Sequence, residues 1–283
     1  MPKAKNHSLR ILQLVCPRAK LLDVSGPLQV FHIASQYTHD GRAYETLLIS
    51  QSGDPVVTDV GVSLATTAYA RLQLRSTDVV LVTGGDGIDE AAKDQDLIAW
   101  LHAQAPKCRA LASTCTGAFL LGAAGFLDNR RAVTHWMACE RLQAQYPKAM
   151  VESDPIFIED DGVWTSAGVT AGIDLALAMV QSDFGSDVSL AIARHLVVYA
   201  QRPGGQSQFS QALRQQVEDK DSEFAALHDW IKKNLNRDLS VERLAERIGM
   251  SPRTFHRNYA KANAMTPARM VTLARLEAAQ ALL

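Results

Sequence analysis

A cysteine with small neighbours follows an apolar run in the first half of the sequence. Cys115 comes directly after residues 110–114, and Ser113 and Gly117 lie two positions to either side of it. This is the spacing of a nucleophile elbow, a sharp strand-to-helix turn in which small neighbours let a strained backbone project the nucleophile. Because a helix N-terminus stabilises a thiolate, the spacing predicts a solvent-reaching thiol in a pocket, able to attack an electrophilic carbon.

Burial as a small hydrophobic residue is the alternative for any single cysteine, and we expect it for Cys16, Cys108 and Cys139. The four cysteines have neither the paired spacing of a zinc site nor the density of a disulfide framework. We therefore expect reduced thiols, no bound metal and no cofactor.

A carboxylate follows the first strand-like run, residues 11–15. Asp23 lies in Leu21-Leu22-Asp23-Val24-Ser25-Gly26-Pro27, where the strand's carboxyl end opens onto the crevice that binds ligands in wound sheets. It can therefore face Cys115. The alternative is that Asp23 caps a helix beginning near Pro27, and a raised pKa of its carboxyl would favour the first interpretation.

Two further strand ends carry residues suited to a pocket. Gly84 and Gly85 follow a buried strand, and their backbone N–H groups can approach an anion or a developing oxyanion; a plain loop is the alternative. His135 and Trp136 place an imidazole and an indole at another strand end, as a pocket wall or as a partly buried histidine with its partner.

A second kind of motif lies near the end of the sequence. In residues 239–255, Ala245 permits close helix crossing and Gly249 can take the positive φ of a tight turn. Ser251 can cap a following helix that has Pro252 at its first position. Phe255, Tyr259 and Ala262 would share the buried face of that helix.

The side chains on the opposite face of this helix indicate a DNA-recognition helix. It carries donor-rich side chains of the kinds that read base edges and grip phosphates in a major groove. The alternative, a solvated charged helix in a small bundle, explains neither the caps nor the absence of acidic residues. The predicted DNA-binding residues are Arg253, Thr254, His256, Arg257, Asn258 and Lys261.

Charge is distributed unevenly although the total is −1. Residues 222–283 have a net charge of +4, and residues 250–276 contain five Lys or Arg and no acidic residue. Such a bias suits a phosphate backbone.

The elements that must position these residues alternate in type. Apolar runs at 11–15, 44–50, 79–83 and 109–114 are separated by amphipathic stretches such as 27–37 and 94–105. Continuous runs such as Val79-Val80-Leu81-Val82 indicate strands covered on both faces. We predict an α/β fold, a three-layer flavodoxin-like sandwich with a mostly parallel sheet, followed by a small all-α helix-turn-helix domain.

Length and composition indicate two domains. With 283 residues, 47% hydrophobic and 21% charged, the chain is long enough for two buried cores. We place the first domain at 8–200, a Gln-, Gly- and Ser-rich linker at 201–221, and the helical domain at 222–283. No run approaches the length of a membrane span and the first ten residues lack a secretory core, so we expect a cytoplasmic protein.

The helical segment resembles the AraC family of regulators in Leu244-Ala245-Glu246, Gly249-Met250-Ser251-Pro252-Arg253-Thr254-Phe255 and residues 266–271. Members of that family normally have two helix-turn-helix units joined by a long helix. This sequence ends at Leu283, within what resembles the joining helix. It is either a piece of a longer protein or a natural short form, for which weak or dimer-dependent DNA binding is expected.

The first domain resembles the PfpI-like branch of the glutamine-amidotransferase-like superfamily, especially regulators that fuse it to AraC-type helices. The resemblance covers nearly the whole chain and is carried by five motifs in the expected order: residues 22–27, 83–85, 113–119, 132–136 and 202–206. It implies that Cys115 matches the superfamily nucleophile and Asp23 the acid facing it. Protease-like members have His after that Cys, whereas Thr116 stands here and is more similar to isocyanide-hydratase relatives.

These observations favour a transcription regulator that binds double-stranded DNA and senses an unidentified small molecule, and both resemblances imply a homodimer. The α/β domain is then expected to be a non-catalytic sensor. An isocyanide-hydratase-like enzyme using Cys115 and Asp23 is the alternative, and a sensor in which Cys115 is chemically modified is a third hypothesis.

Overall fold

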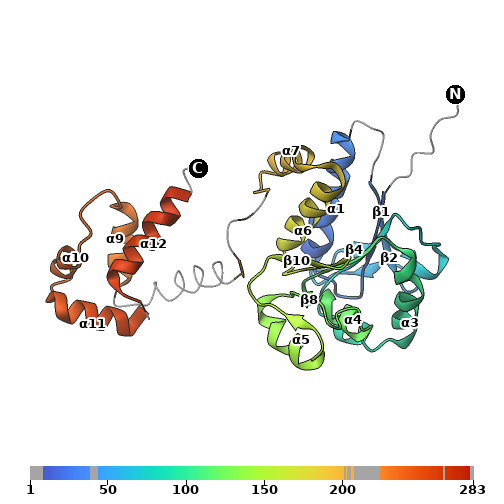
Figure 1. Cartoon of the computed structure of the whole chain (residues 1–283), viewed down its shortest axis with the longest axis horizontal. Coiled ribbons are helices and arrows are strands. Elements are labelled where there is room, and N and C mark those ends of the chain that lie inside the picture. The colour runs from blue at the N-terminus through green and yellow to red at the C-terminus, as the bar shows by residue number, and fades with distance from the viewer. Residues whose placement is uncertain are drawn as a thin grey trace. The chain divides into compact units, whose positions relative to one another are not determined.

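The computed structural model describes residues 9–38, 44–200, 202, 205–206, 224–263 and 265–280. The chain divides into two units, residues 1–208 and 209–283, here called the α/β unit and the helical unit (Figure 1). Of the predicted linker, 201–221, the described residues include Arg202, Gly205 and Gln206, and the remainder lies outside them.

The apolar runs of the α/β unit belong to a mostly parallel sheet, as predicted, and this sheet has seven strands. Its order is β10-β11-β7-β6-β1-β2-β5, and every neighbouring pair is parallel except β10 with β11. The edge strand β10 can run antiparallel because a tight turn at Asp161 and Gly162, both with positive φ, joins it to β11. The strands are β1 (Leu9–Leu14), β2 (Tyr44–Ser50), β5 (Thr67–Ala68), β6 (Asp78–Val82), β7 (Ala110–Thr114), β10 (Phe157–Asp160) and β11 (Val163–Ser166).

Helices cover both faces of this sheet, which confirms the predicted three layers (Figure 1). Val79 and Leu81 of β6 face one helical layer, while Val80 and Val82 face the other, and all four are fully buried. The first layer holds α1 (Leu21–Tyr37), α6 (Ala171–Phe184) and α7 (Ser186–Leu196); the second holds α2 (Ile88–Ala91), α3 (Gln95–Gln104), α4 (Ala118–Ala123) and α5 (Cys139–Gln145).

Two small ribbons outside the main sheet are not expected from the sequence. β3 (Val56–Val57) pairs antiparallel with β4 (Ser63–Leu64), and β8 (Arg131–Ala132) pairs parallel with β9 (Met150–Val151). Two-residue strands carry too little periodicity to be recognised.

A buried ion pair joins β1 to β6. The guanidinium of Arg10 contacts both carboxylate oxygens of Asp78, with Nε–Oδ1 at 3.1 Å and Nη2–Oδ2 at 2.5 Å. Both side chains are almost completely buried, and Asp78 also accepts the backbone N–H of Arg75 at 2.7 Å. The pair fixes two central strands side by side.

The described residues of the helical unit form four helices, in agreement with the predicted all-α domain. They are α9 (Ala225–Lys233), α10 (Val241–Arg247), α11 (Pro252–Asn263) and α12 (Pro267–Gln280). Their core is rich in aromatic rings, with Phe224, Phe255 and Tyr259 in mutual contact and the buried His228 bonded to the Tyr259 hydroxyl at 2.7 Å. Among the described residues of both units, no helix is long and apolar enough to cross a membrane.

Candidate functional site

The turn after β7 has the sharp geometry that the elbow spacing predicts. Cys115 has φ +52°, in the left-handed region that non-glycine residues rarely adopt, and it starts a short 3₁₀ turn, Cys115–Gly117, that continues into α4. Gly117 must be small because a Cβ there would lie 2.4 Å from the carbonyl oxygen of Val82. The chain therefore passes from strand to helix within a space that admits no larger residue.

Two more glycines close around the same backbone. A Cβ on Gly84 would lie 2.7 Å from Cys115 Cβ, and one on Gly168, which has φ +79°, would lie 2.1 Å from it. Gly84 was selected from the sequence as a pocket residue; Gly168, two residues beyond β11, was missed. Both make room for the elbow.

Asp23 lies beside the elbow with no exposed surface. It belongs to the first turn of α1, whose N-cap is Lys20, and its Oδ1 accepts the backbone N–H of Val169 at 2.7 Å. The alternative that Asp23 caps a helix beginning near Pro27 is therefore wrong. The helix continues through Pro27. Because proline has no N–H to donate to the Asp23 carbonyl, that carbonyl instead accepts a hydrogen bond from the buried Gln13 side-chain amide at 3.0 Å.

Burial dominates the protonation of this carboxyl. Burial raises the pKa of Asp23 to about 6, against hydrogen bonds from Val169, Thr114 and Cys115 and the charge of Lys20, which lower it. The side-chain partners are near but poorly aligned: within the described chain, Asp23 Oδ2 and Thr114 Oγ1 have no partner in good hydrogen-bond geometry. The raised pKa agrees with the interpretation that Asp23 faces Cys115.

The thiol itself differs from the expectation. Cys115 is only 6% exposed, and burial, followed by the charge of Asp23, raises the pKa of its thiol to about 12, although Thr116 lowers it. A solvent-reaching thiol with a stabilised thiolate was predicted, and this is wrong for the structure. A short helix start offers little compensation where a buried carboxylate lies next to the sulfur.

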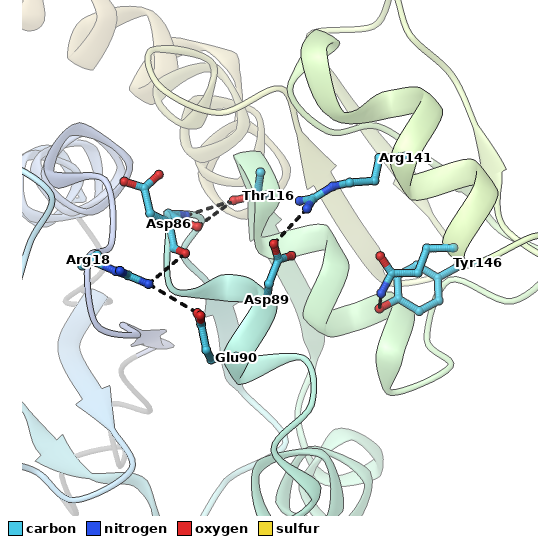
Figure 2. Close-up of polar contacts among 9 residues, drawn as sticks. Arg18, Asp86, Asp89, Glu90, Thr116, Arg141 and Tyr146 are labelled. Carbon is cyan, nitrogen blue, oxygen red and sulfur yellow. Dashed lines mark hydrogen bonds and ion pairs between the residues drawn. The ribbon is translucent and has the colours of Figure 1, made fainter.

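Gly85 and Thr116 bond one another across the site. Gly85 N–H donates to Thr116 Oγ1 at 3.0 Å, and the same hydroxyl lies 3.3 Å from the Gly85 carbonyl oxygen (Figure 2). The Gly85 N–H is thus already used, so the structure does not present it as a free oxyanion donor. The loop serves instead to hold Thr116 in place.

Exposed ion pairs surround this loop. Arg18 bonds the Asp86 carbonyl at 3.4 Å and Glu90 at 3.5 Å, and Arg141 bonds Asp89 at 2.8 Å (Figure 2). All four charged side chains are about half or more exposed, so each pair contributes little stability.

The motif around His135 contacts the elbow through the preceding residue, Thr134. Thr134, which is fully buried, donates its hydroxyl to the Cys115 carbonyl at 2.8 Å. His135 is half-buried, burial lowers its pKa, and its Nδ1 accepts the Met137 N–H at 3.4 Å, while the Trp136 ring is 43% exposed. Among the described residues no hydrogen bond joins His135 to Cys115. Thr134 was missed because its hydroxyl carries no distinctive sequence signal.

The second candidate site is the helix-turn-helix of the helical unit. Gly249 has φ +69° between α10 and α11, and Ser251 Oγ accepts the Thr254 N–H at 3.3 Å, as expected for a helix cap. Phe255 and Tyr259 are buried in the core. Ala262, expected on the same buried face, is exposed because the aromatic contacts of this face end at Tyr259.

The outer face of α11 carries the predicted DNA-binding side chains. Arg253, His256, Arg257 and Lys261 are exposed, and Thr254 and Asn258 are partly exposed. In the part of the chain that the structure describes, no carboxylate pairs with the arginines or the lysine of this face. Among the described residues, no carboxylate therefore neutralises the positive charge of this face.

Comparisons with known proteins match both units. Residues 9–182 match the model of the DJ-1/PfpI family. The isonitrile hydratase of Pseudomonas putida is 32% identical over 197 residues, covering 69% of this chain and 81% of that protein. The HTH-type transcriptional regulator GbdR of Pseudomonas aeruginosa is 26% identical over 284 residues, covering 100% of this chain and 76% of the regulator.

A solved structure supports the fold of the first unit. A ThiJ/PfpI family protein from Pseudomonas syringae superposes with a TM-score of 0.60 at 27% identity, covering 69% of this chain and 77% of the other. The similarity to the hydratase is confined to part of the chain, whereas the similarity to the regulator continues through the helical unit.

Proposed function

The chain belongs to the DJ-1/PfpI family, and from this premise we propose that it is a sequence-specific DNA-binding transcription regulator whose α/β unit senses a small molecule. The observation that carries the proposal is the exposed, unneutralised cationic face of α11 behind a capped helix-turn-helix. Similarity to a regulator along the whole chain supports it. An enzyme alone would give the helical unit no task.

The chemistry of the α11 face matches a DNA major groove. Arg253, Arg257 and Lys261 can bond phosphates or the O6 and N7 of guanine, and Asn258 can bond the N6 and N7 of adenine. Thr254 and His256 add neutral donors and acceptors. The buried Phe255 and Tyr259 hold the helix so that this face remains outward.

The effector site is proposed at the elbow. Asp23 Oδ2, Thr114 Oγ1 and Ser113 Oγ are buried without hydrogen-bond partners among the described residues, and such groups are satisfied by a ligand or water in most proteins. Val169, which bonds Asp23, also lines a cavity of about 320 Å³. The other lining residues are the aliphatic Leu21, Leu22 and Val60 and the polar Lys20, Ser25 and Asp59. An effector with a polar end and an apolar body suits this surface.

We also propose that the protein acts as a homodimer in the cytoplasm. A dimer through the α/β unit would present two α11 helices to half-sites about one helical turn apart. Sedimentation at micromolar concentration tests this part, and a strictly monomeric protein would contradict it.

Isonitrile hydration is a second candidate, favoured by the proximity of Asp23 and Cys115 and by the relative of that name. The Cys115 sulfur would attack the isocyano carbon as its proton moves to Asp23, and Asp23 would return that proton to the same carbon to give a thioimidate. Water would then add to this carbon and break its bond to sulfur, which releases an N-substituted formamide and restores the thiol. The thiol pKa of about 12 opposes the first step in the resting protein. Conversion of an isonitrile, lost in Cys115→Ala, would support the enzyme.

Selection from a pool of randomised duplexes tests the regulator most generally. The purified chain, at near-physiological salt and with excess non-specific DNA, is expected to enrich one motif or an inverted pair of motifs. Enrichment of no sequence, with the protein folded, would contradict the proposed function.

A further inference from the structure

The last described residues of the α/β unit are tied to the elbow on one side. Gln206 is 6% exposed, and its side-chain Nε2 donates to the carbonyl oxygens of Thr134 at 3.2 Å and Pro155 at 3.0 Å. Its backbone N–H bonds the Asp154 carbonyl at 2.6 Å. A Cβ on Gly205 would lie 2.3 Å from Asp154 Oδ1, so this approach requires a glycine before Gln206.

Thr134 links Gln206 to the backbone of Cys115. Its carbonyl accepts from Gln206, and its hydroxyl donates to the Cys115 carbonyl at 2.8 Å. A single buried residue thus separates Gln206 from the strained backbone of Cys115, whose φ is +52°.

Arg202 provides a similar connection to the other half of the site. Its guanidinium bonds both carboxylate oxygens of Asp174, with Nε at 2.9 and 3.0 Å, and its Nη1 donates to the Thr170 hydroxyl at 3.0 Å. The residue before Thr170 is Val169, which has φ +53° and donates its N–H to Asp23 Oδ1. Two residues, Thr170 and Val169, therefore link Arg202 to Asp23.

Both connections converge on the segment from which the chain continues to the helical unit. Gln206 is buried and Arg202 is partly exposed, and the two side chains reach opposite halves of the same strained site. Left-handed φ values at Cys115 and Val169 make these backbones sensitive to what Asp23 and Cys115 contact. A ligand that repositions either backbone must change the hydrogen bonds that hold Arg202 and Gln206.

We propose that Arg202 and Gln206 form a two-armed clasp through which the state of the Asp23–Cys115 site sets how firmly the segment leading to the helical unit is held. The inference rests on the proposed sensing function, which it extends by naming the residues that transmit the signal. Arg202, Gln206 and Thr134 are positioning residues, because each acts on the site through another residue.

Thermodynamic reciprocity makes the clasp measurable without DNA or the natural effector. If the hydrogen bond from Gln206 to Thr134 restrains the backbone at Cys115, loss of that bond should make the Cys115 sulfur more accessible to a reagent. The probe is iodoacetamide, which alkylates the Cys115 sulfur with loss of iodide and a proton. The full chain is labelled, and modification of each cysteine is followed by peptide mass spectrometry.

Gln206→Ala is expected to accelerate Cys115 alkylation roughly 2- to 10-fold, the factor set by one hydrogen bond of ordinary strength. Gln143→Ala is the matched control: Gln143 also donates Nε2 to a backbone carbonyl, that of Ala149 at 2.9 Å, but on the α5 side of the unit. The control should leave the Cys115 rate unchanged. Arg202→Met should likewise increase amide exchange in the peptide containing Val169.

A double-mutant cycle separates the clasp from simple loosening. In Thr134→Val the hydroxyl is absent, so adding Gln206→Ala should have no further effect on Cys115, whereas Thr134→Ser should restore it. Equal effects of Gln206→Ala in all three backgrounds, or no effect in folded protein, would overturn the clasp. Because neither assay contains DNA, failure of DNA binding would leave these results standing and would count only against the proposed function.

Discussion

The carboxyl group of Asp23 lies next to the thiol of Cys115, and its negative charge raises the pKa of that thiol, after burial, to about 12. The two groups therefore do not form a preformed thiolate pair. At neutral pH the carboxyl is mostly ionised, with a pKa of about 6, and the sulfur keeps its proton. This protonation pattern suits a site that waits for a ligand better than one poised for nucleophilic attack.

Removing the charge of Asp23 should make the thiol easier to ionise. In Asp23→Asn the pKa of Cys115 should fall, yet stay above that of an exposed thiol because burial is the larger cause. The pH dependence of the Cys115 alkylation rate measures this pKa. A pKa that stays at about 12 in the variant would show that the two groups do not interact.

The same substitution should change how stability depends on pH. Asp23 titrates at about 6 in the folded protein and at 3.8 ordinarily, so between these values the folded state holds a proton that the unfolded state has lost. Stability contributed by this group therefore falls as pH rises from about 4 to 6, by about 3 kcal/mol in all. Asp23→Asn should stabilise the α/β unit by up to that amount at pH 7, with the gain disappearing below pH 4.

Calorimetry of the full chain at several pH values measures this gain. Asp59→Asn is the control of opposite sign, because the Leu21 N–H and other contacts lower the pKa of Asp59, whose stabilising contribution is lost as pH falls. A stability difference for Asp23→Asn that does not vary between pH 4 and 7 would be inconsistent with the raised pKa.

Gly168 should tolerate no side chain. Gly168→Ala would place a Cβ 2.1 Å from Cys115 Cβ at φ +79°, combining overpacking with backbone strain, so we expect a loss of about 3 kcal/mol or more. Gly125→Ala is matched in backbone, with φ +73°, but meets nothing within 4 Å, so it should cost only about 1–2 kcal/mol. Thermal unfolding compares them, and equal losses would refute the close approach to Cys115.

The Arg10–Asp78 pair should be expensive to break. Asp78→Asn leaves the buried Arg10 charge without its carboxylate, which typically costs about 3–5 kcal/mol. Glu152→Gln breaks the exposed Arg131 pair, whose loss should change the free energy of unfolding little because solvent screens it. Denaturation of the two variants by urea separates these cases, and a similar small loss in both would contradict a desolvated pair.

The sequence predicts the layers of the fold and the turn at Cys115 because these depend on local patterns. Runs such as Val79–Val82 show burial on both faces directly, and Ser113 and Gly117 mark the elbow by their spacing. The capped start of α11 is likewise readable from Ser251 and Pro252.

The electrostatics and the supporting contacts of the site are not local, and the sequence does not predict them. The high pKa of Cys115 depends on burial and on Asp23, which is remote in the chain. The parts played by Thr134, Gly168 and Gln206 exist only once three strand ends and the residues after α7 are brought together. A hydroxyl or an amide carries no sequence signal for such contacts.

DNA binding by the α11 face tests the central claim most directly. The affinity of the full chain for DNA from upstream of its own gene is measured against salt, for the wild type, Arg253→Ala/Arg257→Ala and a charge-matched control, Arg71→Ala/Arg194→Ala, which alters two exposed arginines of the α/β unit. The proposed function predicts specific, salt-sensitive binding by the wild type and the control. In the α11 variant it predicts much weaker binding and a log–log salt slope reduced by about 1–2. Equal affinity and slope in all three proteins, or no specific binding at low salt, would contradict it.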